Sequence, residues 1–170
     1  MDPGFDETQV LFEQNPEHFV REISRRKALA LRERFRNQVI LTADTTVYKG
    51  GRLFMKPESS EEAAGMLAEL SGSKHEVFTG VSVCLDEEIF SDVEQSSIYL
   101  QDLTSAQIEV YHRHFFPLDK AGGYTVQKGG SVIVKRIEGC YYNIMGLPLE
   151  TTRRLLMKVG IDLWDYLKSV

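Results

Sequence analysis

The sequence predicts one α/β or α+β domain, with two lobes built around a single sheet. Helical and strand patterns mix along the whole length, and no repeat, low-complexity stretch or linker divides them. A chain of 170 residues has the usual size of one domain, and it can bury a core without disulfides or metals. The composition, 42% hydrophobic and 26% charged, is that of an ordinary globular protein.

The first element is expected to be a helix over about residues 15–35. Asn15 suits the N-cap, and the proline after it suits the first helical position. Ile23 and Leu31 fall on one face at helical spacing, and Lys27 falls between them. An unpaired lysine is costly to bury. Lys27 therefore either has a function or buries only its apolar stem and extends its ammonium to water.

A buried strand is predicted at residues 38–42, where a short apolar run occurs. Asp44 follows directly, and the ligand sites of open α/β sheets collect beyond the carboxyl ends of strands. The alternative for Asp44 is a place in a turn or cap, where aspartate is common. Gly50 and Gly51 predict a hairpin turn, after which the chain returns toward Lys56.

The middle of the chain predicts a second helix and two strands. Ser59 and Glu62 form a capping box that opens the helix, and Gly72 ends it. The strands are expected at residues 75–85 and 89–100, with an acidic turn between them.

The last third predicts two more helices and two more strands. A capping box at Thr104 starts a helix toward Phe116. A short strand is expected at residues 124–127, between two pairs of glycines, and another at residues 131–137. The last helix is predicted over about residues 150–159, followed by a glycine stop.

Composition excludes several classes of protein. The net charge of -5 argues against general binding to nucleic-acid polymers, which needs a basic surface, although a local basic pocket could still hold one polyanion. No apolar run reaches the roughly 18 residues of a membrane span, and the N-terminus does not have the pattern of a signal peptide. Cys84 and Cys140 are far apart, which indicates reduced thiols and a cytoplasmic location.

Four ionisable residues in the first third could form one site, namely Glu7, Lys27, Asp44 and Lys56. Two carboxylates can hold Mg²⁺ or Mn²⁺, which prefer oxygen ligands. Two lysines can bind phosphate oxygens as point charges. Hydrolysis of a phosphoanhydride needs both parts, because the cations stabilise the charge that develops on phosphate and a carboxylate can activate water.

Other candidate sites are weaker. His112 and His114 would diverge on a helix, and no third zinc ligand is evident. The glycine pairs match neither a phosphate-binding P-loop nor a dinucleotide fingerprint. Trp164 and the pair at residues 141–142 are expected in the core or at an interface.

A series of short segments carries a resemblance that covers nearly the whole chain. In order they are Phe5-Asp6-Glu7-Thr8, Lys27-Ala28, Ala43-Asp44-Thr45, Lys56-Pro57, Met66-Leu67 with Leu70-Ser71-Gly72, His75-Glu76-Val77-Phe78-Thr79-Gly80-Val81, Asp119-Lys120-Ala121-Gly122-Gly123-Tyr124, Gln127, Ile137-Glu138-Gly139, Tyr142-Asn143 and Gly146-Leu147-Pro148-Leu149. Their order and spacing resemble the Maf (septum-formation inhibitor Maf-like) family of nucleotide pyrophosphatases.

The resemblance implies an elongated α/β fold like that of Maf and ITPase-type proteins, with a mixed twisted sheet flanked by helices and two lobes around a cleft. It implies hydrolysis of nucleoside triphosphates to the monophosphate and pyrophosphate with Mg²⁺ or Mn²⁺. By motif, Glu7 and Asp44 correspond to the catalytic and metal-binding acids. Lys27 and Lys56 correspond to the lysines that bind phosphate.

The resemblance also bears on the substrate and the assembly. Gln127 falls where the subgroup that prefers dTTP and UTP carries a glutamine, and Thr45 and Asp119 are expected to line the same cleft. A homodimer is expected by family analogy.

The N-terminal part of the family pattern is not found before Phe5 in the sequence given. Family members begin with a strand and a Ser-x-Ser-Pro-Arg-Arg loop, which would supply N–H groups and arginines to the triphosphate. We therefore expect residues 1–170 to be one Maf-like domain that is N-terminally incomplete, with a start upstream of Met1 and an exposed strand edge. The alternative to an active enzyme is a catalytically impaired nucleotide-binding regulatory protein linked to septum formation. An interaction domain without a nucleotide site is disfavoured by the two acids and two lysines.

Overall fold

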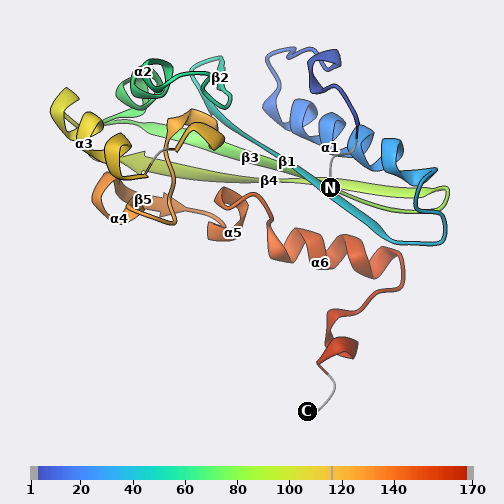
Figure 1. Ribbon diagram of the computed structural model, residues 1–170. Coiled ribbons are helices and arrows are strands. Elements are labelled where there is room, and N and C mark those ends of the chain that lie inside the picture. The colour runs from blue at the N-terminus through green and yellow to red at the C-terminus, as the bar shows by residue number, and fades with distance from the viewer. Residues whose placement is uncertain (1–3, 116, 168–170) are drawn as a thin grey trace.

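Five strands form one sheet in the part of the chain that the computed structural model describes, residues 4–115 and 117–167 (Figure 1). The strands are β1 (Ile40–Lys49), β2 (Arg52–Phe54), β3 (Lys74–Leu85), β4 (Glu88–Leu100) and β5 (Val134–Glu138). Their order is β2-β1-β3-β4-β5, and each neighbouring pair is antiparallel. The α/β class is confirmed, but the parallel pairs of a mixed sheet do not occur among the described residues. Short turns join β1 to β2 and β3 to β4, and such turns can join only antiparallel strands.

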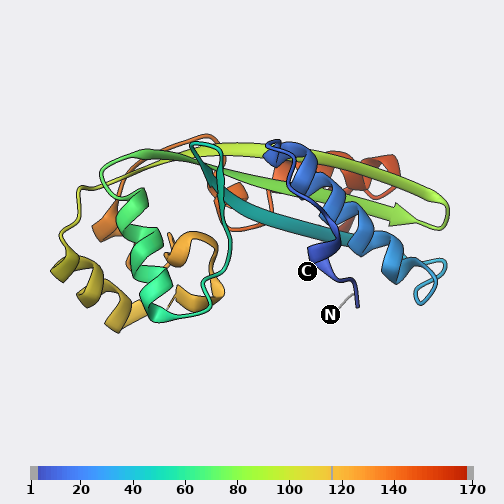
Figure 2. The ribbon, with the colours of Figure 1, turned by 90° about the horizontal axis from the view of Figure 1, so that it is seen from above.

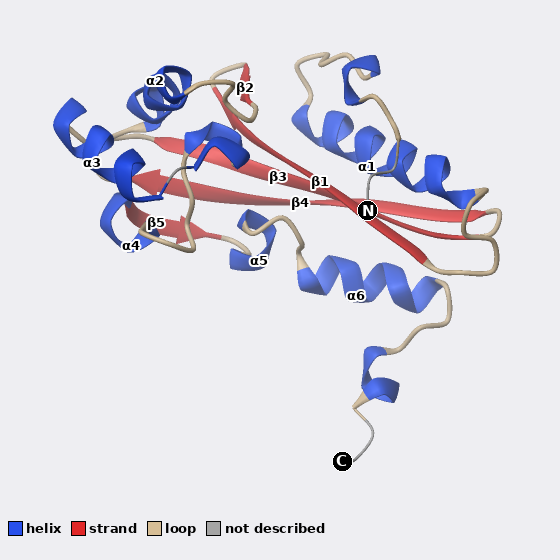
Figure 3. Cartoon of the chain, in the orientation of Figure 1, coloured by secondary structure: helices blue, strands red, loops and turns tan. Residues whose placement is uncertain are grey.

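Helices flank the sheet, as expected (Figure 3). They are α1 (Pro16–Arg32), α2 (Ser60–Leu70), α3 (Ser105–Phe115), α4 (Gly130–Ile133), α5 (Tyr141–Ile144) and α6 (Leu149–Lys158), with short 3₁₀ helices η1 (Glu7–Gln9), η2 (Pro117–Asp119), η3 (Ala121–Gly123) and η4 (Leu163–Tyr166). Phe116, toward which the third helix was predicted to run, lies outside the described residues. In the described part of the chain, no helix combines the length and apolarity needed to cross a membrane.

The two faces of β3 are covered by different helices. The Ser82 hydroxyl lies 2.9 Å from the hydroxyl of Ser24 on α1, whereas Val81 packs with Leu155 of α6. Successive side chains of a strand point to opposite faces. Consequently α1 and α6 lie on opposite sides of the sheet (Figure 2), and β3 is buried along nearly its whole length.

Gly80 allows α1 to lie directly on the sheet. A Cβ atom at Gly80 would be 2.3 Å from the carbonyl oxygen of Val20, which is far inside van der Waals contact. Only glycine fits a position where a helix backbone approaches a strand this closely. The close approach fixes how far α1, and therefore Lys27, stands from β1 and β3.

The other end of the sheet carries the second lobe, with α2, α3 and the glycine-rich loops (Figure 1). Leu67 of α2 and Ile108 of α3 belong to the same buried cluster as Val77 and Ile98 of the sheet. The elongated, two-lobed shape expected from the resemblance is thus seen, with α1 and α6 at one end and α2 and α3 at the other.

The structure corrects the predicted strand limits. β1 runs through residues 40–49, so Asp44 lies within a strand, and not beyond its carboxyl end. β-branched residues at 45–47 favour this extension. β2 pairs only with Val47–Lys49. Among the described residues, the remainder of β1 therefore has a strand neighbour on one side only.

The glycine-rich segment also differs from the prediction. Residues 124–127 form no strand but follow η3, and residues 131–137 begin as α4 before they become β5. Gly122, Gly123 and Gly129 have φ between 69° and 76°, a left-handed conformation that breaks an extended ladder. The apolar pattern at 124–127 arises instead from a buried loop, because Tyr124 lies in the core.

Candidate active site

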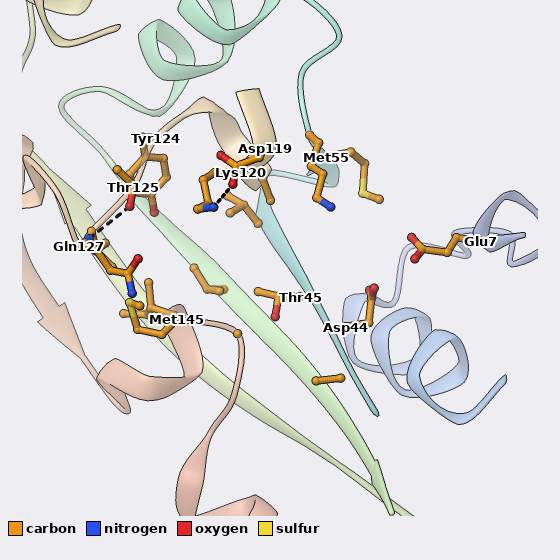
Figure 4. Close-up of a pocket in the computed structure, with 18 of the residues that line it drawn as sticks. Glu7, Asp44, Thr45, Met55, Asp119, Lys120, Tyr124, Thr125, Gln127 and Met145 are labelled. Atoms are coloured by element: carbon orange, nitrogen blue, oxygen red, sulfur yellow. Dashed lines mark hydrogen bonds and ion pairs between the residues drawn. The ribbon is translucent and has the colours of Figure 1, made fainter. Parts of the chain in front are cut away.

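A cavity of about 530 Å³ lies at the free edge of β1, between the two lobes (Figure 4). It is lined by every residue that the sequence singled out for the site, namely Glu7, Lys27, Asp44, Thr45, Lys56, Asp119 and Gln127. These residues come from η1, α1, β1, the segment after β2, η2 and the loop after η3. Six segments of the sequence thus meet at one concave surface, whereas the chemical roles of the residues remain predictions.

Lys27 is held between two carboxylates. Its Nζ atom lies 2.8 Å from Oδ1 of Asp44 and 2.6 Å from Oε1 of Glu7. The side chains of Lys27 and Asp44 are only 14% and 10% exposed, while that of Glu7 is 45% exposed. Burial of this lysine is possible because its charge is paired on both sides. In the structure the Lys27 ammonium is thus paired with carboxylates and does not simply reach water, while its function stays a prediction.

The environment changes the pKa of both partners. Burial raises the pKa of Asp44, and the nearby Glu7 adds to this effect, while Lys27 and Lys56 oppose it. Burial lowers the pKa of Lys27, but the two carboxylates outweigh it, so that this pKa is raised overall. The result is a firmly protonated ammonium beside a carboxylate whose proton affinity is above the ordinary value.

The donor set fits a divalent cation that is shared with a substrate. Glu7 and Asp44 already converge on one positive charge, with oxygens 2.6 and 2.8 Å from the same nitrogen. Within residues 4–115 and 117–167, no group of three or more His, Cys, Asp or Glu side chains could hold a metal. Mg²⁺ typically binds through one or two carboxylates and takes its other ligands from water and phosphate. A closed structural metal site is therefore not available among these residues, but a shared one is.

Lys56 also lines the cavity. Its charge lowers the pKa of Asp44 and also that of Asp119, so it is electrostatically close to both. Asp119 itself is paired with Lys120, which lowers the pKa of that carboxyl most strongly. Lys120 also lines the cavity and was not assigned a role, although it stands in a segment that carried the resemblance.

The far end of the cavity is less charged. Gln127 lies there with Thr125, Val126 and Met145 (Figure 4), and the backbone N–H of Gln127 donates to the Thr125 hydroxyl at 3.3 Å. Met145 could not be found from the sequence, because nothing in the pattern shows that α5 packs against β3 and β4.

Tyr124 connects this end of the cavity to the sheet. Its hydroxyl is 2.6 Å from Nε2 of His75 on β3, and both side chains are buried. Burial raises the pKa of Tyr124 and lowers that of His75 to about 4. The pair is thus neutral near pH 7, and it anchors the loop that carries Thr125, Val126 and Gln127.

The cavity spans both faces of β1. Asp44 pairs with Gly80 and faces α1, whereas Thr45 pairs with Thr79 and faces α5. Neighbouring strand residues point in opposite directions. The free edge of β1 therefore separates a charged end of the cavity from a largely neutral end.

Comparison with known proteins places this geometry in a family. A family model described as Maf-like protein matches residues 1–159. The chain is 42% identical over 166 residues to a protein of Chlamydia trachomatis serovar D named dTTP/UTP pyrophosphatase, a match that covers 97% of this chain and 85% of the relative. It is 42% identical over 164 residues to a Chlamydia muridarum protein named nucleoside triphosphate pyrophosphatase, covering 96% and 84%.

A more distant relative gives the same result. The chain is 37% identical over 165 residues to a dTTP/UTP pyrophosphatase of Clostridium perfringens, with 94% of this chain and 85% of the relative covered. Both the family match and the matches to these relatives cover nearly all of the sequence. The chain therefore belongs to the Maf-like protein family.

Proposed function

We propose that this protein is a nucleoside triphosphate pyrophosphatase that hydrolyses dTTP or UTP to the monophosphate and pyrophosphate with Mg²⁺ or Mn²⁺. The observation that carries the proposal is the meeting of two acids and two lysines in one cavity. The names of the relatives from Chlamydia and Clostridium support the same activity and substrates.

The charged end of the cavity would bind the triphosphate. Lys27 and Lys56 would hold phosphate oxygens, and Glu7 and Asp44 would hold the divalent ion together with those oxygens. The ion supplies charge stabilisation for the phosphoryl oxygens. Lys27 contributes in the same way, because its ammonium is fixed beside Asp44 before any substrate arrives.

Asp44 is the best-placed general base. Its carboxylate lines the cavity beside Lys27, where it would take the proton of the attacking water. A water oxygen attacks the α-phosphorus, its proton passes to Asp44, and the bond from that phosphorus to the bridging oxygen breaks. Pyrophosphate leaves with the electron pair of the broken bond, and the monophosphate keeps the new oxygen.

The neutral end of the cavity would bind the nucleoside. The Gln127 amide offers both a donor and an acceptor, which suits the adjacent N–H and C=O of a thymine or uracil ring. Thr45 and Asp119 lie between Gln127 and the charged end, and would contact the substrate there.

The experiment that tests the proposal is a pyrophosphate-release screen over canonical and modified triphosphates, with Mg²⁺ or Mn²⁺. We expect multiple turnovers with dTTP and UTP, and a loss of at least ~10²-fold in kcat for Asp44→Asn because it removes the base. Glu109→Gln, an exposed acid on α3, is the matched control and should keep full activity. Full activity in a well-folded Asp44→Asn protein would contradict the assignment.

The same screen decides the alternative of an impaired regulatory protein. Thermal stabilisation by nucleotide without any turnover would support that alternative. We also propose a cytoplasmic location, since the cysteines are free thiols, and no binding to nucleic-acid polymers, since the net charge is -5. A homodimer is proposed by family analogy, and light scattering would test it.

A further inference from the structure

Thr45 belongs to a chain of hydrogen bonds that leads away from the cavity. Its Oγ1 atom is 2.8 Å from Oγ1 of Thr79, its cross-strand partner on β3. Thr79 is fully buried, and its Oγ1 atom is in turn 2.9 Å from the backbone carbonyl oxygen of Asn143 on α5.

The direction of this chain is fixed by the carbonyl group. A carbonyl oxygen can only accept, and each hydroxyl has a single proton. Thr79 must therefore donate to Asn143, which leaves Thr79 only able to accept from Thr45. If Thr79 donated to Thr45 instead, the Thr79 hydroxyl oxygen and the Asn143 carbonyl oxygen would lie 2.9 Å apart in a buried site with no proton between them.

Asn143, the last acceptor in this series of hydrogen bonds, is rigidly held. The side-chain amide of Asn143 donates to the carbonyl oxygen of Val77 and to Oγ of Ser96, both at 3.0 Å. Its backbone carbonyl also accepts the N–H of Gly146 at 2.9 Å. The acceptor that sets the direction therefore cannot turn away without breaking several buried hydrogen bonds.

As a result, the Thr45 oxygen presents only lone pairs to the cavity. Phosphate and carboxylate oxygens have no proton to give near pH 7, so Thr45 cannot bind them by a hydrogen bond. Its partner in a nucleotide must be a sugar hydroxyl or a base N–H. A ligand can reach this oxygen, since Thr45 lines the cavity and is only partly buried.

The position of Thr45 selects between these donors. In Figure 4 it lies between the acids, Asp44 and Glu7, and the neutral end with Gln127 and Met145. The sugar is the part of a nucleotide that joins phosphate to base. dTTP lacks the 2′-hydroxyl that UTP has, so a contact common to both substrates is with the 3′-hydroxyl.

We propose that Thr45 accepts a hydrogen bond from the sugar 3′-hydroxyl and so positions the nucleotide between the two ends of the cavity. This inference rests on the proposed function, because it assumes that a nucleoside triphosphate occupies the cavity. The sequence predicted only that Thr45 lines the cleft. The inference adds that Thr45 is a hydrogen-bond acceptor and that its donor is the 3′-hydroxyl.

The test compares kcat/KM for dTTP and its 3′-deoxy analogue. The wild-type protein should prefer dTTP roughly 10-fold, the effect of one hydrogen bond. Thr45→Val should lose about that factor with dTTP and should no longer discriminate, while Thr45→Ser should keep the preference. Thr79→Val disturbs the same buried chain but leaves the Thr45 oxygen in place, so it should also keep the preference.

Two outcomes would overturn the inference. One is an unchanged preference for dTTP in folded Thr45→Val. The other is a Thr45→Val variant that still prefers dTTP over its 3′-deoxy analogue but has lost the wild-type preference for dTTP over N3-methyl-dTTP. That result would place Thr45 at the base. If the wild-type protein releases no pyrophosphate, the proposed function fails. The preference for dTTP over its 3′-deoxy analogue is then measured as a ratio of dissociation constants. Failure of the proposed function and failure of the Thr45 contact therefore remain distinguishable.

Discussion

Lys27 shows how far single residues could be interpreted from the sequence. Its place on an apolar helix face marked it as unusual, and it is paired with Asp44 and Glu7 in the structure. The pairing partners could be guessed only through the family resemblance, because they come from separate segments. The positions of Met145 and Lys120 on the cavity wall were not predicted, since neither a methionine nor a lysine beside an aspartate is unusual in a sequence.

His75 gives a prediction of stability against pH at the same scale. Burial lowers its pKa to about 4 in the folded protein, whereas an unfolded histidine has a pKa near 6.5. Between these values the unfolded chain binds more protons, so acid favours unfolding. The contribution of His75 is complete above pH 6.5 and declines as the pH falls toward 4, by about 3 kcal/mol in total.

Urea unfolding at several pH values from 7.5 to 4.5 would measure this effect. His75→Gln cannot titrate, so its stability should fall less steeply in acid than that of the wild type. His114→Gln, a change on α3 away from the buried pair, should leave the wild-type slope unaltered. Parallel slopes for wild type and His75→Gln would show that the histidine does not remain neutral when folded.

At the scale of elements, the helices and long strands were predictable and the glycine-rich segment was not. Capping residues such as Asn15 and Ser59 start helices where expected, because caps act locally. The strand predicted at residues 124–127 is wrong: these residues form a loop in which only Tyr124 is buried. Asp44 lies within β1 for a related reason, since strand length depends on pairing with β3, which the sequence does not display.

The contact between α1 and β3 can be tested at Gly80. Gly80→Ala puts a methyl group 2.3 Å from a backbone oxygen of α1, so the helix must move outward. We expect a loss of at least about 2 kcal/mol in unfolding free energy and a lower kcat, since α1 carries Lys27. Urea unfolding and pyrophosphate release measure the two effects.

Gly65→Ala is the matched control for that substitution. Gly65 lies inside α2, and a Cβ there would meet nothing within 4 Å. Alanine in a helix is favoured over glycine, so this variant should be neutral or stabilised by about 0.5–1 kcal/mol. Equal stabilities for the two alanine variants would mean that α1 does not depend on the close approach at Gly80.

For the whole molecule, the arrangement of the cavity predicts that a nucleotide links the two lobes. Residues that line the cavity come from the α1 end, such as Lys27, and from the opposite lobe, such as Gln127. A ligand that contacts both lobes stabilises only the folded state. This dependence on distant segments is also why the lining of the cavity needed the structure or the family pattern.

A thermal-shift series with a non-hydrolysable dUTP analogue and Mg²⁺ measures this linkage. At 100 times the dissociation constant the gain is about 2.7 kcal/mol, or a rise in Tm of roughly 5–10 °C. Lys56→Ala should show a smaller rise because a phosphate contact is lost. Lys135→Ala, an exposed lysine on β5 outside the cavity, should match the wild type.

The one-sided pairing of β1 has a consequence for how the aspartate variant is handled. Residues 40–46 read Ile-Leu-Thr-Ala-Asp-Thr-Thr, and Asp44 is the only charge among them. A charge on a strand that has one free edge discourages other chains from adding to that edge. Asp44→Asn therefore removes a chemical group and a guard against self-association together, and low turnover of this variant supports the catalytic role of Asp44 only in samples that light scattering shows to be free of aggregates.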